Sequence, residues 1–505
     1  MSTLAQGDTT INISDEILET IVFETVVLDD VGEEFADAVK IELTSTAGTS
    51  LQTETTGSTV LSGESLQGTA EDPASISLVT DDSGGAQFVS VDTATITNTV
   101  ITTEESVNGS TVAAATIVLS SEEIESVSIK VASTAEKSEI SFDQSTESLD
   151  DVQIEMEGAG GTLDIQSAQV ESLKVKAAGE QFSEIKFGAD VEKVNNAQIE
   201  FGESGGSLEM EGGTLSASTI SIATSNDVVN SVAIGSSVES VSDTTLELSK
   251  GSSNIDISSN VVENVSVVAS SKKPTSLEVD SADVSGFTLS VARSTANLSL
   301  DSDNKIEGTT LDSSTKGNFA ASIDAANKDT AISNTKGGDL EASFNAKTIN
   351  PTISNSGKGT VEANFSATVR GASIESSKGP IEASFSGKSL DIVVDASTSK
   401  APVDLSFDSK ATNVNLSLGK GSDEIIFGGK ISGSSSVDLG SDKKEDTISI
   451  NKSKKVIDPL EISNFGKQDL LSLGSETYSY KAIKEFYAIE SFPISNWSDI
   501  IVLSI

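Results

Sequence analysis

Short runs of alternating apolar and polar residues recur along most of the chain at a nearly fixed interval. They are clearest over residues 331–428, where five aligned segments each combine an apolar-x-apolar run, a turn that contains Lys, and a second run that ends in Phe. The closing residues follow one another at steps of 21, 20, 22 and 20 residues: Phe344, Phe365, Phe385, Phe407 and Phe427. Such alternation predicts strands with one buried face. A repeat of about 21 residues predicts a β-solenoid in which each repeat forms one coil.

A looser form of the repeat precedes this block, and a V-E-x-apolar run is its clearest marker. Counting one apolar residue per repeat gives steps of 21 to 25 residues through these positions: Ile124, Leu149, Val170, Val191, Leu215, Val238, Val262 and Val284. We therefore predict an all-β fold, an elongated parallel β-solenoid with coils of about 21–24 residues. Leu300, Ile323 and Phe344 are expected to lie in one core column that continues from the loose repeats into the regular ones.

The repeat divides the chain into three parts. We predict that residues 1–95 form an N-terminal cap or assembly segment, residues 96–450 the solenoid, and residues 451–505 a C-terminal cap that carries an export signal. Within the first part, the apolar residues 17–28 fit a helix or a strand equally well. The open ends of a parallel solenoid carry unpaired backbone groups. We therefore expect the non-repeating caps to cover them or to contact the end of another copy.

Charge and composition narrow the classes of function. The net charge is −46, and the first 120 residues contain twenty Asp and Glu against one Lys, Lys40. This charge repels phosphate, so we expect neither nucleic acid nor an anionic membrane surface as a partner, whereas a divalent cation would be attracted. The chain has no Cys and no His, which removes thiol nucleophiles and the commonest general base. The most apolar early run, 17–28, is too short for a transmembrane segment.

Two columns of charge follow the regular repeat. One is basic: Lys336, Lys358, Lys378, Lys400 and Lys420. The other is acidic: Glu341, Glu362, Glu382, Asp404 and Glu424. A catalytic site would be expected to interrupt the repeat at one place, so we interpret both columns as scaffold and expect no enzyme. We also expect the two columns to interleave, because opposite charges one coil apart offset the repulsion within each column.

One stretch near the end of the repeats carries a possible metal motif. The sequence GKGSDEII (419–426) resembles the G-x-G-x-D core of the calcium-binding nonapeptide of RTX proteins, with Asp423 as its acid. A second, poorer copy at 439–450 contains Asp442 and Asp446. The resemblance implies Ca²⁺ as a cofactor, with Asp423, Asp442 and Asp446 as ligands. The alternative is an ordinary Gly-Asp turn that ends the stack.

The C-terminal region adds to the same resemblance. Residues 458–480 are similar to the I-x-x-F-x-x-x-D-x-L-x-L stretch that follows calcium repeats in RTX-type proteins, and the chain ends in SDIIVLSI. An acidic residue before a short apolar end, here Asp499 before Ile500, Ile501 and Val502, implies an uncleaved signal for type I secretion machinery. It would account for the absence of an apolar N-terminal leader in this sequence. The alternative is that 498–505 form a final strand that pairs with the cap.

These features favour three functions in order. The first is a secreted structural protein, resembling RTX-like bacterial surface-layer or extracellular fibre proteins, whose partner is itself in a lattice or filament at the cell surface or outside the cell. The second is a surface adhesin or binding module on a solenoid stalk, with cell-surface polysaccharide as its partner. The third is a polysaccharide-acting β-helix enzyme, which the absence of Tyr and Trp before residue 470 disfavours.

Overall fold

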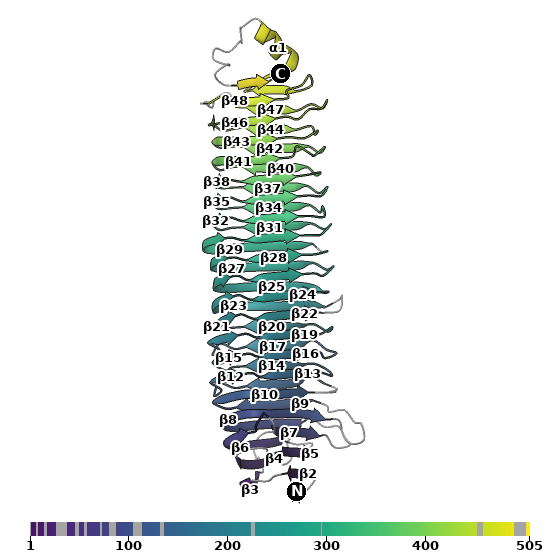
Figure 1. The fold of residues 1–505 in the computed structure, drawn as a ribbon, viewed down its shortest axis with the longest axis vertical. Helices are drawn as coiled ribbons and strands as arrows, with labels where there is room; N and C mark the ends of the chain where they lie inside the picture. The colour runs from purple at the N-terminus through teal and green to yellow at the C-terminus, as the bar shows by residue number, and fades with distance from the viewer. Residues whose placement is uncertain are drawn as a thin grey trace. The chain divides into compact units, whose positions relative to one another are not determined.

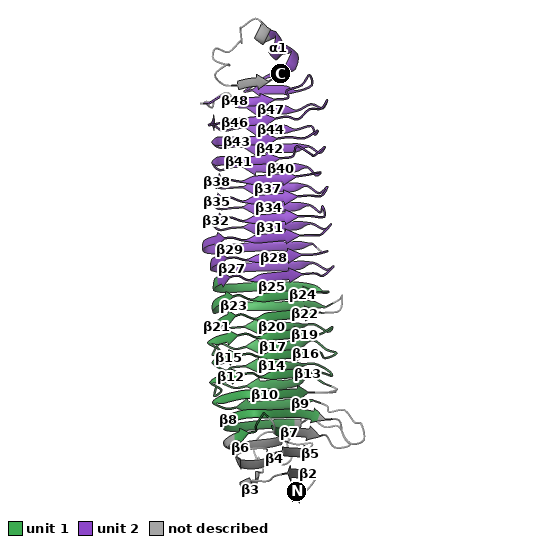
Figure 2. Cartoon of the chain, in the orientation of Figure 1, with its two compact units in different colours: residues 1–261 green, residues 262–505 purple. Residues whose placement is uncertain are grey.

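The structure, a computed structural model, is almost entirely β: 62% of residues lie in strands and 2% in a helix. The strands form a parallel β-solenoid of about 17 turns with a spacing of about 22 residues, which confirms the predicted fold class. The chain divides into two compact units, residues 1–261 (unit 1) and 262–505 (unit 2) (Figure 2). The structure describes residues 2–6, 9–14, 18–26, 38–45, 50–54, 58–70, 73–79, 87–104, 114–131, 136–223, 228–293, 295–451, 458–488 and 501–504.

Each regular coil contains three strands, and each strand pairs in parallel with its equivalent in the next coil (Figure 1). In one coil these are β34 (Leu340–Phe344), β35 (Thr348–Ile349) and β36 (Thr352–Asn355), which pair with β37, β38 and β39. A coil therefore has three faces, which we call the first, second and third face in chain order. The second-face strands are only two to four residues long in coils where all three strands are separate.

Unit 1 begins with strands of both directions. They are β1 (Ser2–Gln6), β2 (Thr9–Ser14), β3 (Leu18–Val26), β4 (Ala38–Ser45), β5 (Ser50–Glu54), β6 (Ser58–Gln67) and β7 (Ala74–Val79). The pairs β1–β2, β2–β5 and β3–β4 are antiparallel, whereas β4–β6 and β5–β7 are parallel. The described part of the ambiguous segment 17–28 is thus a strand. β8 (Gln87–Glu104) crosses residue 95 without a break and pairs with strands on both sides in the chain.

The remaining coils of unit 1 repeat the three-strand pattern. The first face contains β9 (Ala115–Ser120), β11 (Ser138–Phe142), β14 (Gly161–Ile165), β17 (Ser183–Phe187) and β20 (Gly206–Met210). The second face contains β12 (Ser148–Asp150), β15 (Gln169–Glu171), β18 (Lys193–Asn195) and β21 (Gly213–Ser216). The third face contains β13 (Gln153–Met156), β16 (Lys174–Ala177), β19 (Gln198–Phe201), β22 (Thr219–Ala223) and β24 (Thr245–Ser249). Longer strands that extend over more than one face are β10 (Glu123–Val131), β23 (Val229–Ser242) and β25 (Ser252–Glu263).

Unit 2 has the same three faces. The first face contains β31 (Phe319–Ile323), β34, β37 (Val361–Phe365), β40 (Ile381–Phe385), β42 (Val403–Phe407), β44 (Glu424–Phe427), β47 (Thr447–Ile450) and β49 (Leu470–Leu473). The second face contains β32 (Asn327–Lys328), β35, β38 (Val369–Arg370) and β45 (Ile431–Ser432). The third face contains β26 (Ser266–Ala269), β28 (Thr288–Val291), β30 (Thr310–Ser313), β33 (Ala331–Asn334), β36, β39 (Ser373–Ser376), β46 (Ser435–Asp438) and β48 (Leu460–Ser463). Strands over two faces are β27 (Thr275–Ser285), β29 (Ala296–Glu307), β41 (Ser389–Asp395) and β43 (Ala411–Ser417).

The core of the regular coils is the Phe column predicted from the repeat. The five rings are buried and stack face to face, with centroids 4.8, 5.0, 4.6 and 5.2 Å apart. These distances match the strand spacing of about 4.8 Å, because each ring is carried by the equivalent residue of the next coil. The predicted column through Leu300, Ile323 and Phe344 is also confirmed by the strand register.

The register corrects two positions of the looser repeat. The partner of Val170 in the next coil is Val194, three residues beyond the predicted Val191. In the same way, the partner of Leu215 is Val241 and not Val238. The V-E-x-apolar run carries two buried apolar residues three apart, so periodicity alone assigned the wrong one in these two coils.

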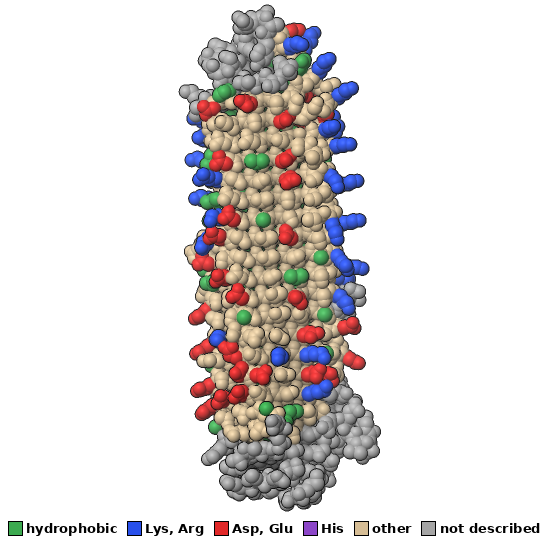
Figure 3. All heavy atoms as spheres, in the orientation of Figure 1, with side chains coloured by type: hydrophobic (Ala, Val, Ile, Leu, Met, Phe, Trp, Pro, Cys, Tyr) green, Lys and Arg blue, Asp and Glu red, His purple; other side chains and the backbone are tan. Residues whose placement is uncertain are grey.

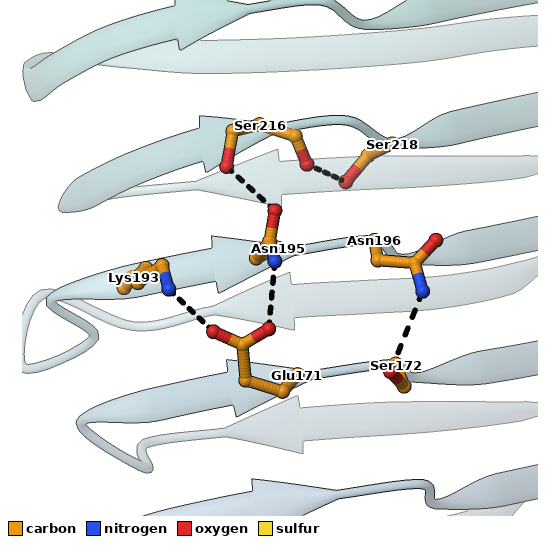
Figure 4. Close-up of polar contacts among 7 residues, drawn as sticks. All are labelled: Glu171, Ser172, Lys193, Asn195, Asn196, Ser216 and Ser218. Atoms are coloured by element: carbon orange, nitrogen blue, oxygen red, sulfur yellow. Dashed lines mark hydrogen bonds and ion pairs between the residues drawn. The ribbon is translucent and has the colours of Figure 1, made fainter.

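The corner after the second face is held by polar ladders between coils (Figure 4). Asn195 donates from Nδ2 to Oε2 of Glu171 one coil earlier at 2.7 Å and accepts from Oγ of Ser216 one coil later at 3.0 Å. The next residue of this corner, Asn196, has a left-handed backbone with φ of 54°. In unit 2 this corner position is held by Asp, Asn and Gly, the residues that adopt positive φ most readily.

The C-terminal end of unit 2 departs from the repeat. β50 (Glu476–Ser479) folds back antiparallel on β49, and α1 (Tyr480–Ala488) follows it. The last strand, β51 (Ile501–Ser504), adds in parallel to β48 on the third face. Residues 501–504 therefore form the final strand proposed as the alternative to a signal alone, and they pair the backbone groups that β48 would otherwise leave open on that side.

Candidate functional site

The predicted metal ligands lie in the last coils of unit 2, where the first-face core changes character. In the regular coils the first residue of each first-face strand is buried and apolar: Leu340, Val361, Ile381 and Val403. From the register, Asp423 before β44, Asp446 before β47 and Asp469 before β49 hold this position in the next three coils. All three side chains are only 2–3% exposed. We call these three residues the aspartate ladder.

Hydrogen bonds between coils fix the aspartate ladder. The N–H of Val403 donates to Oδ1 of Asp423 at 2.9 Å, and the N–H of Asp423 donates to Oδ1 of Asp446 at 2.9 Å. The N–H of Asp446 donates to Oδ1 of Asp469 at 3.2 Å. In the regular coils the equivalent N–H groups donate to main-chain carbonyls of the following coil at 2.8–3.1 Å. Each carboxylate of the ladder therefore replaces a main-chain acceptor as well as an apolar side chain.

Burial makes the charged form of the ladder costly. Removal from water raises the pKa of Asp423 to about 6 and that of Asp446 to about 7, although each accepts a backbone N–H that favours the carboxylate. Burial also raises the pKa of Asp469. The negative charges of neighbouring aspartates add to this effect, because like charges disfavour ionisation of one another. A proton or a cation would relieve the repulsion at neutral pH.

The third predicted ligand, Asp442, belongs to the same cluster. It lies in the turn before β47, half-buried, and its Oδ1 accepts the N–H of Lys444 at 2.8 Å. Its charge raises the pKa values of Asp423 and Asp446. The structure thus brings the three predicted residues together. It adds Asp469, which the sequence analysis quoted within the I-x-x-F-x-x-x-D-x-L-x-L stretch without assigning it to the cluster.

Two carboxylate oxygens of this cluster have no hydrogen-bond partner although they are buried: Oδ2 of Asp423 and Oδ2 of Asp442. Unpartnered carboxylate oxygens suit Ca²⁺, which takes oxygen ligands. On the other hand, among the residues that the structure describes, no three acidic side chains converge closely enough to hold a metal ion. The ammonium of Lys444 lowers the pKa of Asp423 and so supplies positive charge near the cluster.

The glycines of the motif have a structural explanation that does not require a metal. A Cβ on Gly421 would lie 2.3 Å from the carbonyl oxygen of Ala401, and a Cβ on Gly419 would lie 2.2 Å from that of Ser399. Gly440 has φ of 73°, and a Cβ there would lie 2.0 Å from the Gly419 carbonyl. These turns stack too closely on the preceding coil for any side chain, so close stacking accounts for the Gly-x-Gly pattern.

The two charged columns of the regular repeat are separate surfaces. The acidic residues occupy the outer side of the first-face strands, whereas the lysines occupy the turns before those strands. No ion pair joins the two columns within the described part of unit 2, where ion pairs form elsewhere, as between Lys328 and Glu307 at 2.8 Å. The expected interleaving is therefore wrong, because the turn places the ammonium groups away from the strand face.

Unit 1 carries an open groove of about 590 Å³ on its third face. Strands β10, β13, β16, β19 and β22 form its floor. Two lysines in it are neutralised by one carboxylate, since Glu155 lies 3.2 Å from the Nζ of Lys130 and 2.9 Å from that of Lys176. Amide side chains of Gln153 and Gln198 complete the lining. This surface offers paired charges and amides to a polar ligand.

The predicted export signal is described only in part. Asp499 and Ile500 lie outside the described residues, whereas Ile501 and Val502 belong to β51. No helix in the described ranges is both long and apolar enough to cross a membrane. Comparisons with protein-family models, with curated proteins and with solved structures found no match to this chain.

Proposed function

We propose that this chain is a secreted structural protein that assembles with itself into a surface layer or filament outside the cell. The observation that carries the proposal is periodicity: the regular coils of unit 2 repeat the same exposed side chains once per coil, at the same register positions. A periodic surface can make the same contact many times along its length, which suits a lattice or fibre. The resemblance of the C-terminal region to RTX-type proteins supports export by type I secretion machinery.

Assembly is tested on the full chain by light scattering and negative-stain microscopy over a series of protein and Ca²⁺ concentrations. We expect growth from single particles to a sheet or filament above a threshold concentration. Monodisperse single chains under every condition would overturn the proposal.

Export is tested by removing residues 489–505 and measuring the protein in the medium of producing cells. The matched control removes one whole coil, residues 345–365, which leaves Phe344 and Phe385 in equivalent positions of successive coils. We expect the terminal deletion to retain the protein in the cell and the coil deletion to be exported. Equal export of both variants would refute a C-terminal signal.

We also propose that Ca²⁺ binds at Asp423, Asp442 and Asp446. The support is the pair of unpartnered buried oxygens and the raised pKa values of two of these residues, which indicate negative charge that no protein group compensates. Calorimetric titration with Ca²⁺ and melting with and without chelator test this. The D442N variant should weaken binding, because it removes one charged ligand without altering the ladder of backbone hydrogen bonds. A melting temperature that chelator leaves unchanged would contradict the proposal.

The groove of unit 1 favours a second function, a binding module for cell-surface polysaccharide. Amides, ammonium groups and carboxylates at this density form hydrogen bonds with sugar hydroxyls. Binding of the full chain to arrayed polysaccharides, lost in a Q153A/Q198A variant, would support it. Wild-type protein that binds no glycan would exclude it.

A further inference from the structure

The two units differ strongly in charge. Residues 1–261 contain 8 Lys and no Arg against 46 Asp and Glu, a net charge of −38, whereas residues 262–505 contain 24 Lys and Arg against 32 Asp and Glu, a net charge of −8. Figure 3 shows Lys and Arg along both edges of unit 2 in that view, and Asp and Glu along the edges of the described part of unit 1. Each unit alone therefore has a surface that the other does not offer.

One position of the coil carries this difference residue by residue. It is the residue directly before each second-face strand. In unit 2 it is basic in four of five successive coils, with Thr368 as the exception, and these residues form the basic column: Lys347, Lys388, Lys410 and Lys430. In unit 1 it is acidic in three of four successive coils, with Ala168 as the exception, and these residues form the acidic column: Glu122, Glu147 and Glu192.

Main-chain hydrogen bonds hold both columns at one residue per coil. In unit 2 the carbonyl of Lys388 accepts the N–H of Val369 at 2.9 Å, and that of Lys430 accepts the N–H of Ala411 at 2.8 Å. In unit 1 the carbonyl of Glu147 accepts the N–H of Gln169 at 3.0 Å. Successive side chains of each column are therefore about 4.8 Å apart in the stacking direction, except where Thr or Ala interrupts it.

These side chains lack counter-charges of their own. The acidic column is exposed, and the basic column is exposed except for the half-buried Lys430. None of the seven makes an ion pair with a described residue, whereas most described lysines of unit 1 are paired, such as Lys186 with Glu211 at 2.9 Å. Like charges one coil apart repel, so each column would gain from a partner that presents opposite charges at the same spacing.

We propose that the basic column of unit 2 docks on the acidic column of unit 1 in a second copy of this chain. This inference rests on the proposed self-assembly and names the surfaces that make it. The spacing supports a second copy as the partner. Two solenoids with the same rise per coil present their charges at the same interval, so that one aligned pair aligns the others. Because unit 1 of the second copy can in turn meet a third, the contact is heterologous and propagates.

The test uses full-length protein with charge reversals. One variant reverses the basic column (K347E, K388E, K410E and K430E), and the matched control reverses four lysines of the other turn column (K336E, K358E, K378E and K400E) with the same change in net charge. A third variant reverses the acidic column (E122K, E147K and E192K), and a fourth combines both column reversals. Circular dichroism and melting establish that each variant is folded.

We expect the threshold concentration for assembly to rise at least about tenfold in either column variant, because several charge pairs are lost at once. The matched control should change less, and the combined variant should recover assembly. Salt should weaken assembly of the wild type, since the screening length falls from about 10 Å at 0.1 M to about 3 Å at 1 M ionic strength.

The outcomes separate the inference from the proposed function. Wild-type protein that never assembles refutes both. Wild-type assembly that the basic-column variant reproduces at the same threshold refutes the docking surface and leaves self-assembly standing. If that variant instead assembles normally but no longer binds an immobilised polyuronate that retains the wild type, the column binds acidic polysaccharide and the inference is wrong.

Discussion

The aspartate ladder predicts an unusual dependence of local stability on pH, and Asp446 is the residue at which to measure it. Burial raises its pKa from an ordinary value near 3.8 to about 7 in the folded chain. A shift of about three units corresponds to about 4 kcal/mol, at about 1.4 kcal/mol per unit. Because the folded pKa is higher than the unfolded one, this stability is fully present below about pH 4. It is lost as pH rises through about 7.

The perturbation is D446N. The amide keeps an oxygen that can accept the N–H of Asp423, at 2.9 Å in the structure, but it cannot ionise. We expect the variant to be more stable than the wild type by about 2–4 kcal/mol at pH 8 and to differ little at pH 4. The range lies at or below the single-residue value because Asp446 and its neighbours titrate together, so that part of each shift belongs to the pair.

The assay is hydrogen exchange followed by mass spectrometry, corrected for the intrinsic pH dependence of exchange. Peptides covering β44 and β47 should show higher protection in D446N than in the wild type at pH 8, with no difference at pH 4. The matched control is E461Q, an exposed carboxyl on β48. Equal protection of D446N and the wild type at pH 8 would show that the ladder carries no net charge there, and would refute the argument from burial.

Three further substitutions test the packing of the coils by chemical denaturation. F385A should lower the free energy of unfolding by about 3–5 kcal/mol, because the ring is fully buried and stacks on its two neighbours at 5.0 and 4.6 Å; a loss below about 1 kcal/mol would contradict a packed Phe column. G440A should cost more than about 1 kcal/mol, since a Cβ there would meet the Gly419 carbonyl at 2.0 Å and φ is 73°; an unchanged midpoint would show that the turn can move. S218A should cost about 1–3 kcal/mol, because the buried hydroxyl accepts the N–H of Ala197 at 3.0 Å; a neutral effect would mean that this N–H finds another acceptor.

The parts of the fold that the sequence predicted are those that depend on side chains repeating at a fixed step. The Phe column and the continuation through Leu300 and Ile323 were predictable because identical or similar apolar residues recur one coil apart. The three-faced cross-section was not, because second-face strands such as Thr348–Ile349 are too short to show an alternation. The wrong positions Val191 and Val238 have the same origin, since two buried residues of one run compete for one place in the count.

The candidate site was predictable only in part for a related reason. Asp423, Asp442 and Asp446 were found from a turn motif, which signals acidic residues near glycines but not the direction of their side chains. That Asp423 and Asp446 replace buried apolar residues follows from the strand register, which also brings in Asp469. In the sequence, the corresponding signal is an Asp at the position where the earlier repeats carry Leu, Val or Ile.

The same substitution implies that unit 2 contains two blocks of coils with different stability. Each Asp of the ladder forgoes the burial of an aliphatic side chain, worth about 1.5–3 kcal/mol, and above its raised pKa it also bears a buried charge. A solenoid sums the stabilities of its coils and their interfaces, so a local deficit is not shared evenly with distant coils. We therefore expect the coils at 424–473 to exchange their amides before the Phe-stacked coils at 340–407 at pH 8, and the difference to narrow at pH 4. Exchange of both blocks at one rate at pH 8 would mean that the coils unfold as a single unit and that the ladder does not weaken its end of the stack.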